Sequence, residues 1–71
     1  MNNFKADHAD DDLLTLGEVA AWTRVSADTL RYWRHRQTGP HSFKIGRRVF
    51  YWRSEVLRWL NEQSDERKRA S

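Results

Sequence analysis

Residues 15–36 read TLGEVAAWTRVSADTLRYWRHR, and this stretch decides the fold. It opens with a Thr-x-x-Glu capping box, in which the Thr15 hydroxyl accepts from the Glu18 N–H while the Glu18 carboxylate reaches back. Apolar residues then recur at helical spacing, which predicts a first helix over residues 16–23.

A second capped segment begins only three residues later. Ser26 is a favoured N-cap residue type, and Asp28 stands in the next turn, where a carboxylate interacts favourably with the positive end of the helix dipole. These residues predict a second helix over residues 27–36, joined to the first by a turn at Arg24 and Val25. Because so short a connection makes two helices cross steeply, the pair predicts a helix-turn-helix.

The residues after the second helix predict a small hairpin and a third helix. Gly39 and Pro40 end the second helix. Two short β-prone runs, 42–45 and 48–51, are separated by a two-residue turn that contains Gly46. A third helix over residues 53–63 carries apolar residues that close a core. The expected fold is mainly α with a small β-hairpin, a winged helix-turn-helix of three helices plus a two-stranded wing.

The chain of 71 residues is expected to form one domain with a polar segment at each end. Residues 1–12 carry one lysine against four aspartates and have no apolar period, so we expect a disordered acidic arm. Residues 13–63 form the expected winged helix-turn-helix domain. Residues 64–71 have no apolar side chain larger than Ala70 and are expected to fray as a polar C-terminal tail.

Basic residues are concentrated in the middle of the chain. The formal net charge is +3, and seven of the nine basic residues within 13–63 lie between Arg24 and Arg48, where Asp28 is the only acid. This concentration favours a polyanionic partner. A solvated basic surface is the alternative.

The outer face of the second helix has the size and charge to enter the major groove of B-DNA, which admits an α-helix. Arginine suits phosphate or the O6 and N7 atoms of guanine, and aspartate suits the N4 amino group of cytosine. The candidate contacts to double-stranded DNA on this helix are Asp28, Thr29, Arg31, Tyr32, Arg34, His35 and Arg36. For each residue alone, a solvated surface side chain is the alternative.

The hairpin is the second candidate DNA-binding element. Lys44, Arg47 and Arg48 surround a turn too small to serve as core. A basic wing of this shape lies along a minor groove or its flanking phosphates. The alternative is a hairpin that uses charge to protect its edges.

Neither an enzyme site nor a bound cofactor is expected. The serines and the three histidines are not brought together by local spacing, and the sequence has neither a phosphate-cradling glycine loop nor a helical i, i+4 pair of metal ligands. The chain has no cysteine, which removes thiolate zinc sites and disulfides. We therefore expect no catalytic residues, no metal and no cofactor.

A cytoplasmic location is the simplest expectation. The first residues lead into aspartates without an apolar h-region, and no apolar run approaches the ~20 residues that span a bilayer. Neither secretion nor membrane insertion is expected.

Two segments carry a family resemblance. Residues 15–20, followed by residues 25–32, closely resemble the DNA-binding head of MerR-type regulators. The later residues resemble the short excisionase-type relatives of that head, including phage excisionases and AlpA-like regulators, over positions 38–40, 43–49, 51, 56 and 59–60. Together the two segments cover about residues 13–61.

This resemblance implies a second helix in the major groove and a wing at the minor groove. The residues that match the family's DNA-binding motifs are Ser26, Thr29, Arg31 and Tyr32 on the helix and Lys44, Arg47 and Arg48 on the wing. Arg24 is a departure, because relatives usually carry glycine in this turn, and it adds a charge near DNA.

The resemblance also implies a role. MerR regulators append a long dimerisation helix and an effector-binding region after the head, whereas this chain ends at Ser71, so we expect neither a coiled-coil dimer nor a small-molecule ligand. The implied function is an excisionase in a bacterial host cell, associated with the nucleoid when bound. Such a protein binds repeated sites cooperatively, bends DNA and directs a separate site-specific integrase toward excision.

Two alternatives stay open at this point. The same domain serves a small MerR-like or AlpA-like transcriptional regulator. A protein-interaction adaptor that uses an exposed Trp22 and the acidic arm predicts no affinity for DNA at low salt.

Overall fold

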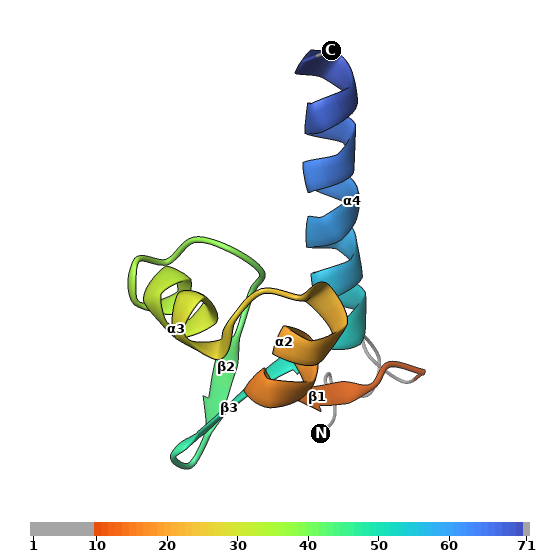
Figure 1. Cartoon of the computed structure of the whole chain (residues 1–71). Helices are drawn as coiled ribbons and strands as arrows, with labels where there is room; N and C mark the ends of the chain where they lie inside the picture. Colours follow the sequence, from red (N-terminus) through yellow and green to blue (C-terminus); the bar gives the residue numbers. More distant parts are fainter. Residues whose placement is uncertain (1–9, 71) are drawn as a thin grey trace.

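A computed structural model describes residues 10–70 of the chain, with side chains described through Asp65. The elements in chain order are β1 (Leu13–Thr15), α2 (Leu16–Thr23), α3 (Ala27–His35), β2 (Phe43–Ile45), β3 (Arg48–Trp52) and α4 (Arg53–Ala70). The β2–β3 hairpin and the far end of α4 point to opposite ends of the molecule (Figure 1). The expected architecture of three helices and a small antiparallel sheet is confirmed.

Both predicted N-caps are present. The Thr15 N–H donates to Glu18 Oε1 at 2.9 Å, and the Glu18 N–H donates to Thr15 Oγ1 at 3.1 Å, which completes the capping box of α2. Ser26 caps α3 by accepting from the Thr29 N–H at 3.1 Å. Helix α3 ends one residue before the predicted position, and Arg36 is its C-cap. These local hydrogen bonds define where each helix of the pair begins.

The turn between α2 and α3 contains a left-handed residue. Arg24 has φ 66° and ψ 20°, and its N–H donates to the Ala20 carbonyl at 2.9 Å. This is the conformation in which glycine most often ends a helix. Arg24 therefore occupies a backbone conformation that costs a residue with a Cβ about 1 kcal/mol or more.

The sheet has one strand more than expected. Its order is β1-β3-β2, with both pairs antiparallel, so the predicted hairpin is present and β1 adds to its other side. Leu14 lies opposite Tyr51, and Phe43 lies opposite Phe50. Strand β1 has only three residues, too few to show an alternating pattern. It pairs with a strand far away in the sequence, so no local signal predicts it. The two-stranded wing is thus part of a three-stranded sheet.

The core lies between the three helices and one face of the sheet. Its buried apolar residues come from each helix and from the central strand and are Leu16, Val19, Leu30, Tyr51 and Val56. Trp33 packs against this core, and the centroid of its ring lies 5.6 Å from that of Trp59. The core therefore positions α3 so that its other face is left to solvent.

The loop after α3 is held close to that helix. Gly39 has φ 77°, and a Cβ at this position would approach Trp33 Cε3 to 2.9 Å. Pro40 follows as a buried residue. The loop therefore needs glycine both for its backbone conformation and for room beside the indole ring.

Helix α4 begins directly after β3 and is capped from a distance. The Asp11 carboxylate accepts from the Ser54 N–H at 3.0 Å and from the Ser54 hydroxyl, and the Asp12 carbonyl accepts from the Arg53 N–H at 2.9 Å. Residues 1–9 of the expected acidic arm lie outside the described residues. Asp11 and Asp12, near the end of the expected arm, thus contact the start of α4. Asp11 and Ser54 are 43 positions apart in the sequence.

The helical region at the C-terminal end is longer than expected. The backbone is helical through Ala70, whereas the sequence predicted a last helix over 53–63 followed by a fraying tail. Residues 64–70 contain no glycine or proline and several strong helix formers, so nothing local ends the helix at Gln63. Within residues 10–70, no helix is long and apolar enough to cross a membrane.

Candidate nucleic-acid interface

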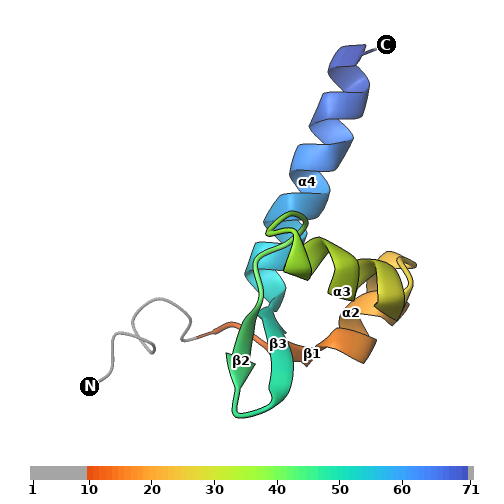
Figure 2. The same ribbon diagram turned by 90° about the vertical axis from the view of Figure 1, so that its left-hand side faces the viewer.

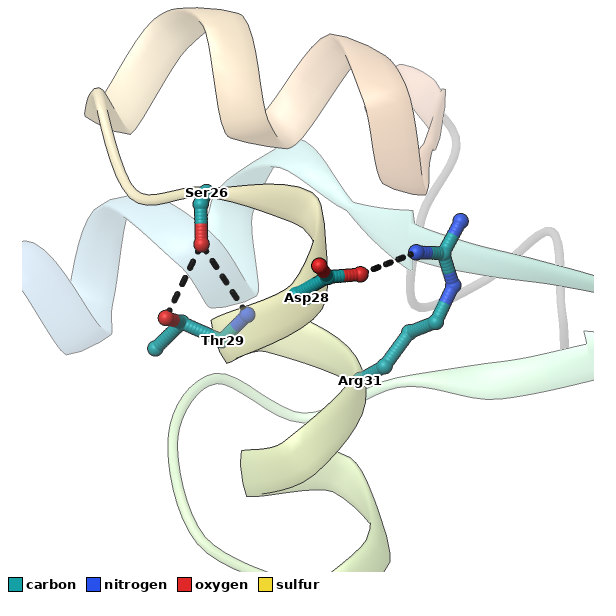
Figure 3. Close-up of polar contacts among 4 residues, drawn as sticks. All are labelled: Ser26, Asp28, Thr29 and Arg31. Carbon is teal, nitrogen blue, oxygen red and sulfur yellow. Dashed lines mark hydrogen bonds and ion pairs between the residues drawn. The ribbon is translucent and has the colours of Figure 1, made fainter.

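The outward face of α3 presents an ion pair and an aromatic residue to solvent. Arg31 Nη1 lies 3.1 Å from Asp28 Oδ1, and their side chains are 63% and 96% exposed. Tyr32 is 57% exposed. Figure 3 shows the Arg31 guanidinium extending past Asp28 toward the strands of the sheet. The cationic face expected on this helix is therefore at the surface.

The wing carries its three basic residues at the surface. Lys44, Arg47 and Arg48 are all exposed, and the Arg48 guanidinium lies over the Phe50 ring, 5.8 Å from its centroid. Gly46 opens the turn with φ 64°, a conformation suited to a two-residue hairpin turn. Figure 2 shows the turn as the far tip of the hairpin, away from α4. The wing thus projects its charges beyond the core.

Helix α3 and the wing meet at one hollow. A cavity of about 410 Å³ is lined by Arg31 of α3 and by Arg47 and Arg48 of the wing, together with Thr15 and Gly17 from the start of α2. The arginines come from segments about 16 residues apart in the sequence, and the fold places them around a single space. Helix α3 and the wing therefore border one hollow, and three arginines line it.

The fold and this surface agree with a comparison across protein families. Residues 13–64 match the helix-turn-helix domain family. The chain belongs to this family. A helix-turn-helix domain implies DNA binding and is typically not an enzyme. No curated protein and no solved structure matched the chain.

Two residues at the start of the second helix of this helix-turn-helix domain bond to each other. The Ser26 hydroxyl donates to Thr29 Oγ1 at 2.9 Å while it accepts from the Thr29 N–H (Figure 3). Thr29 is half-buried and Ser26 is exposed. Both hydroxyls thus form part of the cap at the N-terminal turn of α3.

The C-terminal end of α3 carries a second pair. Arg36 Nη1 donates to the Tyr32 hydroxyl at 3.4 Å, and the Arg36 guanidinium lies over the Tyr32 ring, 5.8 Å from its centroid. His35 is exposed beside them. These three candidates share the solvent-facing side of α3 with Arg31.

Arg34 lies less open to solvent than the other candidates on the helix. It is half-buried, and its Nε atom is buried without a hydrogen-bond partner. Burial raises the pKa of the Tyr51 phenol, while the Arg34 charge and a hydrogen bond with Ser42 oppose that rise. Arg34 also lines a hollow of about 620 Å³ beside the loop after α3. Its side chain therefore lies close to the phenol of the core, at the margin of the outward face.

Two further candidates lie outside α3 and the wing. Arg24 is exposed in the turn of the helix-turn-helix domain. Trp22, the residue of the adaptor alternative, is 37% exposed, and the Arg53 guanidinium lies over its ring at 5.2 Å from the centroid. Part of the Trp22 ring is therefore covered by the first residue of α4.

Sequence reasoning missed the contribution of the start of α2 to the hollow. Thr15 was assigned only a capping role, and Gly17 was assigned none. An isolated glycine within a helical pattern costs about 1 kcal/mol relative to alanine. That signal was present in the sequence at Gly17.

Proposed function

We propose that this helix-turn-helix protein is an excisionase, an architectural protein that binds double-stranded DNA at repeated sites, bends it and directs an integrase toward excision. The observation that carries the proposal is the junction of the exposed cationic face of α3 with the arginine-tipped wing at one hollow. A helix and a wing joined in this way suit two neighbouring grooves of one duplex.

In the proposed complex, α3 lies in the major groove. Arg31 and Arg36 contact phosphates or guanine, and Tyr32 donates its hydroxyl to a phosphate. Asp28 accepts from the N4 amino group of cytosine, and the capped first turn at Ser26 and Thr29 approaches the backbone. The exposure of Asp28, Arg31, Tyr32 and Arg36 supports this assignment. Arg34 and His35, near the end of α3, contribute at the edge of the contact, and Arg34 contributes least because it is half-buried.

The wing lies along the minor groove or its flanking phosphates. Lys44, Arg47 and Arg48 are its contacts, and Arg24 adds a charge from the turn between α2 and α3. Contacts to phosphate position a protein without reading sequence, so we expect the wing to supply affinity and α3 to supply sequence preference.

The polar second half of α4 favours an excisionase over a regulator that dimerises through a coiled coil. Residues 61–69 contain no apolar side chain, so this stretch has no a/d stripe for a coiled-coil dimer. The excisionase-type resemblance of the loop and wing supports the same assignment, over positions 38–40, 43–49, 51, 56 and 59–60. Protomers that do not pair through such a helix are suited to binding side by side on direct repeats.

Binding strength favours cooperative assembly on DNA. If about six side chains neutralise phosphates, the logarithm of the binding constant falls with the logarithm of salt at a slope near −5, and a lone domain binds at roughly micromolar concentration. Bending a site costs on the order of 1–6 kcal/mol, which contacts from several neighbouring protomers offset. We therefore expect self-association on DNA.

An excision assay tests the proposal. Integrase and attachment-site DNA are incubated with and without this protein, and we expect excision to rise and integration to fall when it is present. Footprinting and a circular-permutation gel shift on the same DNA are expected to show tandem direct repeats and a strong bend. Absence of stimulation, together with protection of an inverted repeat over a promoter without bending, would instead identify a transcriptional regulator. Absence of any duplex binding at low salt would favour the protein adaptor.

A further inference from the structure

The hollow between α3 and the wing combines three arginines with the apolar residues Leu16, Ala27 and Val49. Arg31, Arg47 and Arg48 line it, and none of its lining residues is acidic. Arginine presents several N–H donors in a planar fork that matches the oxygen atoms of a phosphate. Three such groups around one space of about 410 Å³ favour a ligand with negative charge.

Arg31 keeps free donors although it is paired. Only its Nη1 atom bonds to Asp28, at 3.1 Å, and its side chain stays 63% exposed. The ion pair therefore limits where the guanidinium lies without using all of its N–H groups. Asp28 itself does not line the hollow.

Gly17 lines the same hollow and has no evident reason within the protein to be glycine. A Cβ at this position would meet only Thr15 Oγ1, at 3.9 Å, which is ordinary van der Waals contact. The positive φ angles among the described glycines belong to Gly39 and Gly46. Glycine inside a helix is unfavourable relative to alanine. An added methyl group would thus lie in space that the protein does not fill.

We propose that this hollow seats one phosphodiester group of the DNA backbone, and that Gly17 leaves room for that group. The inference rests on the proposed DNA-binding function and names the ligand of one part of the interface. The seated phosphate bonds to Arg31 from one side and to Arg47 or Arg48 from the other. It fixes the register between the groove that holds α3 and the groove that holds the wing.

Gly17→Ala tests the proposal in the full chain, with Ala21→Ser as the matched control at an exposed position of α2 that does not line the hollow. We expect Gly17→Ala to unfold at the same temperature as the parent chain or higher, and to bind duplex DNA about 10-fold more weakly, the size of one lost charge-assisted hydrogen bond. The control is expected to bind as the parent does.

A neutral backbone substitution locates the phosphate. In duplexes with single methylphosphonate linkages, the parent chain is expected to lose affinity at each contacted phosphate. At one of these positions, the seated phosphate, Gly17→Ala is expected to show little further loss. Equal affinity of Gly17→Ala and the parent, with the same profile across the linkages, would overturn the phosphate seat and leave DNA binding intact. If the parent binds no duplex at low salt, the proposed function fails and the seat fails with it.

Discussion

Asp28 and Arg31 form a solvent-exposed ion pair on the outward face of α3, with 3.1 Å between Oδ1 and Nη1. An exposed pair of this kind adds only about 0–1 kcal/mol to stability. Its position matters more than its energy, because it places the only acid of the segment between Arg24 and Arg48 beside a candidate DNA contact. The pair therefore affects what α3 does at a duplex more than how it folds.

Asp28→Asn is expected to strengthen binding to random duplex DNA about 3- to 10-fold at low salt, because it removes an acid that faces the polyanion and frees Arg31. The preference for the cognate site over random DNA is expected to narrow. Fluorescence anisotropy with both duplexes measures the two effects. Glu62→Gln, an exposed position on α4, is the control and should change neither. Weaker binding of the variant to both duplexes would show that Asp28 neither repels DNA nor restrains Arg31.

Replacing Arg47 and Arg48 together by alanine is expected to weaken binding to every duplex and to make the salt slope about 2 units less steep, because two phosphate contacts are lost. Titrations at several salt concentrations measure the slope. Arg58→Ala is the control, since Arg58 pairs with Glu55 on α4. An unchanged slope in the double variant would show that the wing does not touch the DNA.

Gly39→Ala is expected to lower the free energy of unfolding by about 2 kcal/mol, because the new Cβ is strained at φ 77° and approaches Trp33 Cε3 to 2.9 Å. Urea unfolding followed by tryptophan fluorescence measures the change. Gly46→Ala is the comparison: its φ is 64°, but nothing lies within 4 Å of the added atom, so about 1 kcal/mol is expected. Equal losses would mean that the Trp33 contact contributes nothing.

Arg24→Gly is expected to raise the free energy of unfolding by about 1 kcal/mol, because glycine adopts the left-handed conformation of this turn without strain. Arg24→Ala keeps the strain and removes the same charge, so it separates the two effects. Both variants should flatten the salt slope of DNA binding by at most about 1 unit. Thermal unfolding in which the alanine variant gains as much as the glycine variant would contradict the backbone explanation.

Tyr51→Phe is expected to reduce the loss of stability at alkaline pH. Burial raises the pKa of the folded phenol above its ordinary value of about 10, so the unfolded chain releases its proton first and stability falls as pH rises above that value. Urea unfolding between neutral and alkaline pH measures the slope, which should be shallower in the variant.

Local signals predicted most of the fold. The capping box at Thr15 and Glu18, the Ser26 cap and the Gly46 turn are each decided by residues within three or four positions of one another. Such patterns carry their hydrogen-bond partners with them in the sequence. The helix pair and the hairpin could therefore be located with little error.

The features that sequence reasoning missed depend on distant partners. Strand β1 exists because β3 offers it a free edge, and the Asp11 cap of α4 joins residues 43 positions apart. Arg34 was expected among the candidate DNA contacts of the second helix, but it is half-buried and lies near Tyr51. None of these contacts leaves a periodic or motif-like trace near the residues that make it.

Strand β3 ends at Trp52 and α4 begins at Arg53, so no loop residue separates the wing from the last helix. The two elements are mechanically continuous, and a tilt of the hairpin on DNA must change the direction of the α4 axis unless the backbone bends at this junction. A spin label on the far half of α4 would consequently report the angle of the wing. The direction of the α4 axis is therefore expected to differ between the free and the DNA-bound protein.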